Sequence, residues 1–143
     1  MLLYASCVIL SDKYSPVLKV NPSEQTPIIG ECNIARYLSR LLSPGAYDSS
    51  DPVTSTQIDG LIDLADTQLS NDGAQKANFV KAISTQLGKS QWMLGGENLT
   101  LADIVLWSAV HQLKQASRAP DNIKRWLDAC NQLPEFALAR QFI

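Results

Sequence analysis

The sequence predicts an α+β fold in which a short strand-forming region precedes a larger all-helical region. The first 30 residues are rich in Val, Ile, Leu and Tyr and are interrupted by turn-forming residues. From Glu31 onward, apolar residues recur at the three- and four-residue spacing of amphipathic helices. Residues 98–107 combine a helix start signal with a run that has almost no polar face, which is typical of a helix buried among other helices.

Three extended segments are expected before the first helix. Residues 3–10 and 17–20 have strand composition, and residues 11–16 supply turn chemistry between them. A short extended piece follows at residues 26–30. Residues 1–10 are apolar but lack a basic region, so they make a poor signal peptide.

Helical periodicity then continues to the end of the chain. The first helix should carry an apolar stripe of Ile34, Leu38, Leu41 and Leu42 and end before Ser43. A second helix is expected at about 53–69 and a third at about 74–87. Their apolar positions are Ile58, Leu61, Ile62, Ala65 and Leu69 in the second, and Ala77, Val80, Ile83 and Leu87 in the third.

The next helix should run from Leu101 to about Gln115 and be apolar on all sides. Thr100 is a good N-cap, and Asp103 stands three residues later, where a capping box places an acidic or amide side chain. A further helix is expected to start near Pro120, with Ile123, Trp126, Leu127 and Cys130 on its apolar face. A short last helix after Pro134 would carry Phe136, Ala139 and Phe142.

Composition narrows the classes of function. The chain has 143 residues, 45% of them apolar, and a net charge of −2, which argues against a nucleic-acid or anionic-membrane binder. No apolar run approaches the roughly 18 residues of a membrane span. Three widely spaced cysteines fit neither a disulfide framework nor a zinc site. We therefore expect a reduced, cytosolic setting, with the nucleus left open as a second compartment.

The chain resembles the glutathione-transferase superfamily at several of these positions. The resemblance covers nearly the whole chain. Thr26-Pro27 lies where the family has a cis-proline before a strand, and Glu31-Cys32 lies where an acidic residue and a serine begin the next helix. The Thr100 to Asp103 capping box on a buried helix is a persistent feature of the family's helical half. The resemblance implies a partial thioredoxin-like subdomain at 1–44, lacking its first strand, helix and strand, and an all-helical subdomain at 53–143.

A narrower resemblance rests on residues 30–38, 87–92, 101–108 and 120–127. These segments are similar to the transferase-like domain of scaffold subunits in the animal multisynthetase complex. The resemblance implies a non-enzymatic scaffold, without cofactor, metal or catalytic residues, that forms heterodimers with other transferase-like domains. The implied partners are the transferase-like domain of glutamyl-prolyl-tRNA synthetase, aspartyl-tRNA synthetase and other scaffold subunits. The scaffold's lysyl-tRNA synthetase-binding arm is not expected in this chain.

Two alternatives stay open. An active glutathione transferase would need a Tyr, Ser or Cys that activates the thiol. Tyr4, Ser6 and Cys7 have suitable chemistry but stand within an apolar strand pattern. Cys32 replaces the expected serine with a weaker donor, although a helix N-terminus could make its thiol reactive. The other alternative is a transferase-like appendage of a synthetase or of translation elongation factor 1.

His111, the only histidine, is expected to be a partly buried polar group with its hydrogen bonds satisfied. Pro27, Thr100 and Asp103 are interpreted as structural. The sequence therefore offers no catalytic constellation that stands on its own, and the charged surface becomes the main candidate for function.

Charge patterning predicts a first docking face, with a pair of solvated helix faces as the alternative. No Lys or Arg occurs between Arg40 and Lys76, whereas six aspartates do. The helix before this stretch carries Arg36 and Arg40 one turn apart, so a basic stripe would lie beside an acidic one. Gly60 inside a helix suggests close approach of another helix. The partner-binding residues expected here are Arg36, Tyr37, Arg40, Thr56, Asp59, Gly60, Asp63 and Thr67.

The helix from Pro120 and the loop before it predict a second docking face. Its expected partner-binding residues are Arg118, Lys124 and Arg125. Related scaffold domains use the corresponding helix and loop for a second, roughly perpendicular contact. A truncated sheet would also leave an open edge, so we expect limited solubility or self-association of the isolated domain.

Overall fold

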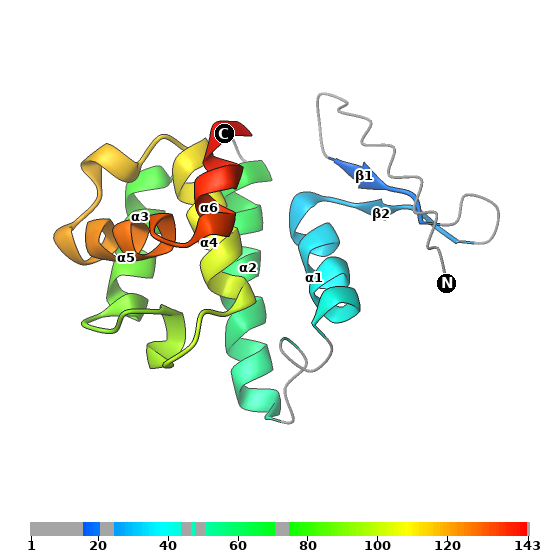
Figure 1. Ribbon diagram of the computed structural model, residues 1–143, viewed down its shortest axis with the longest axis horizontal. Helices are drawn as coiled ribbons and strands as arrows, with labels where there is room; N and C mark the ends of the chain where they lie inside the picture. The colour runs from blue at the N-terminus through cyan, green and yellow to red at the C-terminus, as the bar shows by residue number, and fades with distance from the viewer. Residues whose placement is uncertain (1–15, 21–24, 44–46, 48–50, 71–74, 143) are drawn as a thin grey trace.

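The computed structural model describes residues 16–20, 25–43, 47, 51–70 and 75–142. A small antiparallel hairpin pairs β1 (Val17–Leu18) with β2 (Ile28–Ile29), in the register Val17 to Ile29 and Leu18 to Ile28. It leads into α1 (Glu31–Leu42), and both lie to one side of the remaining helices (Figure 1).

Those helices are α2 (Pro52–Ser70), α3 (Lys76–Leu87), α4 (Leu101–Gln112), α5 (Asp121–Asn131) and α6 (Pro134–Ala139). Three short 3₁₀ turns accompany them, η1 (Met93–Gly95), η2 (Ala116–Arg118) and η3 (Arg140–Phe142). The expected α+β order of a strand region followed by helices is confirmed.

The hairpin differs from the expectation at Pro27. No peptide bond among the described residues is cis, so the predicted cis bond before Pro27 is wrong. The trans form is intrinsically favoured even before proline. The expected strand at 3–10 lies outside the described residues, and the strand expected at 17–20 is shorter, covering Val17–Leu18.

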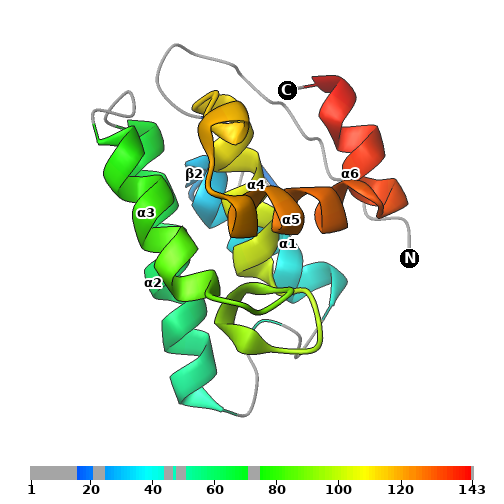
Figure 2. The ribbon, with the colours of Figure 1, turned by 90° about the vertical axis from the view of Figure 1, so that its left-hand side faces the viewer.

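Helix α4 forms the centre of the helical half. It packs most extensively against α2 and also contacts α1, while α5 crosses beside it (Figure 2). Most of its side chains are buried, as the sequence predicts, although Ile104 is an exception at 45% exposed. Its fully or almost fully buried residues are Ala102, Asp103, Val105, Leu106, Trp107, Ala109 and Val110.

The predicted capping box at the start of α4 is present, and its acidic residue does more than cap the helix. Asp103 Oδ2 accepts hydrogen bonds from the Thr100 backbone N–H and hydroxyl, both at 2.9 Å. Asp103 Oδ1 accepts two more, from the Met93 backbone N–H and from Trp126 Nε1, each at 2.9 Å. One fully buried carboxylate therefore joins the loop before α4, the start of α4 and the middle of α5.

Helix α4 ends three residues earlier than predicted. The backbone N–H of Gln115 donates to Val110 at 3.0 Å, and that of Lys114 donates to His111 at 2.9 Å. These two bonds form a Schellman-type helix end, which requires a left-handed backbone conformation at the first residue beyond the helix cap. Lys114 occupies that position with φ 55°, and sequence periodicity carries no signal for it because glycine is the usual residue there.

The buried face of α1 also differs from the prediction. Cys32 is the residue of α1 that is fully buried, and Ala35 packs beside it against the core. Leu38, Leu41 and Leu42 are 38%, 49% and 75% exposed. Ile34 is half-buried, so the stripe that the periodicity predicts to be buried is only partly covered by the described residues.

The other helices bury most of their predicted faces. Ile58, Leu61, Ile62 and Ala65 of α2 are in the core, as are all four apolar residues predicted for α5. In α3, Phe79 takes a core position and Ala77 is exposed. At the C-terminal end, Phe136 is buried, whereas Phe142 is 83% exposed.

We expect Asp103→Ala to lower the free energy of unfolding by about 3 kcal/mol or more. Removing the carboxylate leaves several buried donors, including Trp126 Nε1, without their acceptor. Urea denaturation followed by circular dichroism measures the change. Glu97→Ala at an exposed loop position is the control and should alter stability by less than about 0.5 kcal/mol. Equal effects of the two substitutions would contradict the role given to Asp103.

Lys114→Gly should raise the free energy of unfolding by about 0.5–1 kcal/mol. Glycine has no Cβ to strain the left-handed conformation, and the exposed Lys114 side chain contributes little packing. The same urea titration checks this. A loss of stability, as glycine causes inside a regular helix, would show that the Schellman-type end does not form.

Candidate docking faces

The basic and acidic stripes of the first predicted face meet inside the chain. Arg36 Nε donates to Asp59 Oδ1 at 2.9 Å, and Arg36 Nη2 donates to Asp63 Oδ1 at 2.6 Å. The Arg36 side chain is only 16% exposed, because it lies between α1 and α2. Arg36, Asp59 and Asp63 thus form an ion-paired clamp that holds α1 on α2.

Tyr47 completes this clamp from the connection between the two helices. Its side chain is buried, its hydroxyl donates to Asp59, and the Arg40 guanidinium lies 4.8 Å from the centre of its ring. Burial opposes ionisation of Asp59, but the hydrogen bonds from Tyr47 and Arg36 outweigh it and lower the pKa of the Asp59 carboxyl. Sequence reasoning missed Tyr47, since a single aromatic residue between two predicted helices carries no docking signal.

The clamp gives Arg36 and Asp59, which the sequence predicts to bind a partner, a structural role within the chain. Their contact with a partner stays a prediction. Opposite charges on consecutive helices are equally compatible with pairing within the chain, and Arg36 pairs in this way with Asp59 and Asp63. Tyr37 is half-buried on α1, and Arg40 is exposed while its guanidinium lies over the Tyr47 ring.

The small-residue part of the first face remains at the surface. Thr56, Gly60, Asp63 and Thr67 are all exposed along one line of α2. A Cβ built on Gly60 would meet no atom within 4 Å. The hydroxyls of Thr56 and Thr67 donate to carbonyls of their own helix, at 2.7 and 2.8 Å. These four residues, called here the α2 stripe, form a shallow strip that another helix could approach closely.

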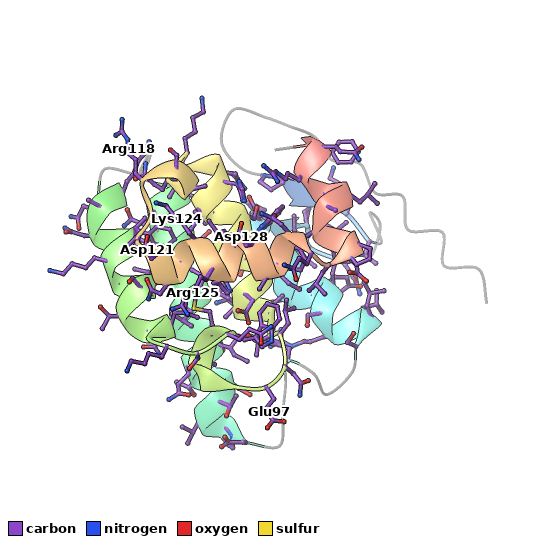
Figure 3. The ribbon with its side chains drawn as sticks, turned by 60° about the vertical axis from the view of Figure 1, so that its left-hand side comes forward. Glu97, Arg118, Asp121, Lys124, Arg125 and Asp128 are labelled. Atoms are coloured by element: carbon purple, nitrogen blue, oxygen red, sulfur yellow. The ribbon has the colours of Figure 1, made fainter. Side chains whose placement is uncertain are left out.

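The second face lies along α5. Arg118, Lys124 and Arg125 are exposed, together with Asp121 and Asp128 (Figure 3). Among the described residues, none of these five side chains forms an ion pair within 4.0 Å. The opposite side of α5 is buried, and Asn122 ties its first turn to α3 by donating to the Ser84 carbonyl at 2.9 Å. The α5 face is therefore a rigidly held surface with charges that the described part of the chain does not pair.

The two residues that resemble a glutathione-binding pair are engaged within the protein. Glu31 accepts hydrogen bonds from Ser108 Oγ at 3.0 Å and from Gln112 Nε2 at 2.9 Å, which join α1 to α4. The Cys32 thiol is buried and lies 3.8 Å from the Ile62 carbonyl oxygen. Burial and the nearby Asp66 carboxylate raise the pKa of this thiol to about 12, so it is not an activated nucleophile.

An apolar pocket of about 280 Å³ lies beside Glu31, between α1, α4 and α6. Ala35, Val105, Phe136 and Ala139 contribute to its walls. Among the described residues, no group of three or more His, Cys, Asp or Glu side chains could hold a metal ion. None of the helices in the described part of the chain is long and apolar enough to cross a membrane.

A small two-stranded sheet followed by a bundle of helices is consistent with a glutathione-transferase-like fold. Residues 77–138 match the family model described as glutathione S-transferase, C-terminal domain. The match covers α3 to α6 with the Asp103 network at its centre, so the predicted fold class is confirmed.

The chain is also homologous to aminoacyl tRNA synthase complex-interacting multifunctional protein 2. It is 38% identical to the Mus musculus protein and 36% identical to the Homo sapiens protein, in each case over 128 residues. These alignments cover 88% of this chain but only 38% of those relatives. The Drosophila melanogaster protein named "Probable aminoacyl tRNA synthase complex-interacting multifunctional protein 2" is 30% identical over 91 residues. This alignment covers 63% of this chain and 27% of that protein. The resemblance stated from the sequence is confirmed.

A double-mutant cycle tests the clamp. We expect a coupling of about 1–2 kcal/mol between Arg36→Ala and Asp59→Ala, because this ion pair is partly buried and shared with Tyr47. Arg36→Ala with Asp63→Ala should couple by less than about 0.5 kcal/mol despite its shorter distance, because the Asp63 side chain is 69% exposed. Urea denaturation of the single and double variants gives both values. The opposite order would show that exposure does not decide their strength.

Proposed function

We propose that this chain is a non-catalytic docking domain that helps to assemble aminoacyl-tRNA synthetases into a multisynthetase complex. The names of its relatives describe proteins that interact with such a complex. The proposed partners are the transferase-like domain of glutamyl-prolyl-tRNA synthetase, aspartyl-tRNA synthetase and other scaffold subunits. The cytosol is the proposed compartment, since synthetases work there.

The observation that carries this proposal is the exposed α2 stripe. Small residues on a helix let a second helix approach closely, because the distance between packed helices depends on the side chains at their contact. Gly60 leaves open space on α2, and the clamp of Arg36, Asp59 and Asp63 fixes that helix against α1. Because the clamp already pairs Asp59 and Asp63, this face would bind mainly through close packing of helices.

The α5 face supports a second, heterotypic contact. Along α5, the exposed charges run Asp121, Lys124, Arg125 and Asp128. If two copies paired antiparallel about the middle of this run, Asp121 would meet Asp128 and Lys124 would meet Arg125. Like charges opposed in this way are repulsive. The face therefore favours a different partner, with acidic side chains at its centre and basic ones at its flanks.

The test is size-exclusion chromatography with light scattering, on this chain mixed with the transferase-like domain of glutamyl-prolyl-tRNA synthetase. We expect a one-to-one complex with the native chain and at least a tenfold loss of affinity with Gly60→Arg, which blocks close approach. The matched control is Ala82→Arg, which places the same side chain at an exposed position of α3. Both variants should unfold with the native transition, since neither position is buried.

Other outcomes of this binding test would change or overturn the proposal. Equal binding by both variants would remove the α2 stripe from the proposal, and the aspartyl-tRNA synthetase arm with Arg125→Glu would then test α5. No complex with any named partner would overturn the docking function. Turnover of a chromogenic electrophile with glutathione far above background would favour the transferase alternative. The chain run alone also tests the expected self-association, which a monodisperse monomer at high concentration would contradict.

A further inference from the structure

We propose that an apolar groove along α1 binds one amphipathic helix of a partner protein, apolar along one side and basic at one end of that side. The groove consists of the pocket of about 280 Å³ between α1, α4 and α6 and of two exposed leucines that continue it along α1, Leu38 and Leu42. It is separate from the α2 stripe and the α5 face. The inference therefore does not depend on pairing with transferase-like domains.

One wall of the groove is a single stripe of α1. Its residues follow one another at intervals of four, three and four positions, which places them on one side of the helix: Glu31, Ala35, Leu38 and Leu42. Glu31 and Ala35 line the pocket, and the two leucines are exposed beyond it. The stripe is apolar except at its first residue and extends for about 16 Å, the length of three helical turns.

α4 and α6 form the other walls. Ile104 and Ser108 line the pocket from α4, and Phe136 lines it from α6. Glu31 bonds to Ser108 toward the end of α4, whereas Ala35 shares the pocket with Ile104 near the start of α4. α1 and α4 therefore run in opposite directions. The stripe leads from the pocket toward the first turn of α4, with its only carboxylate at the far end.

The walls favour a helix over an extended peptide. The backbone N–H and C=O groups in the middle of α1 and α4 are used within those helices, so they offer no partners to another backbone. An extended peptide would bury unpaired backbone groups against apolar side chains, which is unfavourable. A helix satisfies its own backbone and presents only side chains, as in other helix-in-groove contacts.

The dimensions favour apolar side chains over a free small molecule. The pocket is slightly smaller than the roughly 300–1,000 Å³ of small-molecule sites. Large apolar residues are exposed beside it, including Ile104 on the otherwise buried α4 and Leu42 on α1. Apolar residues gathered in this way mark an interaction surface. A partner helix would place one side chain in the pocket and others along the leucines.

The charge of the pocket selects the polar end of the partner helix. Glu31 and Glu135 line it, and no Lys or Arg among the described residues does. Neither carboxylate forms an ion pair within the described part of the chain. The donors to Glu31, from Ser108 and Gln112, are uncharged, so they leave its negative charge uncompensated. A basic residue at one end of the partner helix would compensate both carboxylates.

The α1 stripe of a second copy fits the groove less well. In a parallel arrangement its Glu31 would lie against an identical carboxylate. In an antiparallel arrangement each Glu31 would lie against Leu42 of the other copy. Neither arrangement supplies a cation, and both bring a carboxylate into a largely apolar contact.

A designed peptide tests the stated chemistry. The probe is an alanine-rich peptide of about 16 residues, long enough to form a helix. Leucines at alternating intervals of four and three residues form one side of it. One arginine stands at each end of that side, so that either direction of binding is served. Fluorescence anisotropy of the labelled peptide follows its binding to the native chain.

We expect saturable binding of this peptide. A peptide of the same composition, with its leucines spread around the helix, should bind more weakly by about tenfold or more. Equal binding of the two peptides would show that apolar content alone decides, and would overturn the proposal. Absence of saturable binding by the first peptide would overturn it as well.

Two variants locate the binding site. Ile104→Arg puts a charged side chain on the pocket wall and should weaken binding by about tenfold or more. Val53→Arg makes the same change at an exposed aliphatic residue of α2 and should leave binding unchanged. Leu42→Ser, at a position that is 75% exposed, should weaken binding by about threefold and decides the matter if Ile104→Arg lowers the unfolding temperature. Equal binding by the two arginine variants, or no effect of Leu42→Ser, would contradict the groove.

A charge reversal tests the basic end of the partner helix. Glu135→Lys should weaken binding of the arginine peptide by about threefold or more. It should tighten, by a similar factor, a peptide in which glutamate replaces both arginines. Asp128→Lys, an equal charge change at an exposed position of α5, is the control at the same ionic strength. Equal effects of the two variants would overturn the assigned charge of the partner.

Analytical ultracentrifugation without peptide tests the alternative occupant. We expect Ile104→Arg to leave the association state of the chain unchanged. A native dimer that this substitution converts to a monomer would assign the groove to a second copy and would overturn the proposal of a partner helix.

Discussion

The buried carboxylate of Asp103 is the constraint on which the helical half depends. Four donors converge on it, from Thr100, Met93 and Trp126. A buried carboxyl group is costly unless its oxygens are hydrogen-bonded, so the loop before α4 and the indole of α5 must be placed accurately. The same bonds fix α5 relative to α4 and therefore set the orientation of the α5 face. Surface geometry at this face is thus a consequence of a buried polar network.

Polar contacts likewise determine how α1 joins the helical half. Few apolar side chains of α1 are buried, and Cys32 supplies the main one. Glu31 bonds to Ser108 and Gln112 at one end of α1, while Arg36 bonds to Asp59 and Asp63 farther along. Polar contacts specify register more sharply than they add stability. This attachment explains why residues that a transferase would use for glutathione are here committed to structure.

The sequence predicted the parts of the fold that follow from local physics. Capping by Thr100 and Asp103, the burial of α4 and the apolar face of α5 each follow from residue type and spacing, and each is present. The left-handed Lys114 was missed because its conformation is imposed by the carbonyls of the preceding turn. The pairing of Arg36 within the chain was not predicted, because a linear sequence does not say whether a charged stripe faces a neighbouring helix or another protein.

The pairing of Arg36 within the chain also distinguishes the interactions that the two candidate faces offer. The α2 stripe presents small residues, hydroxyls bonded to their own helix, and one carboxylate, Asp63, that is paired with Arg36. Binding there would rest on packing, which depends weakly on salt. The α5 face keeps charges of both signs that the described chain does not pair, and contacts between such exposed charges are screened by salt. Under the proposed docking function, added salt should therefore weaken a contact at the α5 face more than one at the α2 stripe.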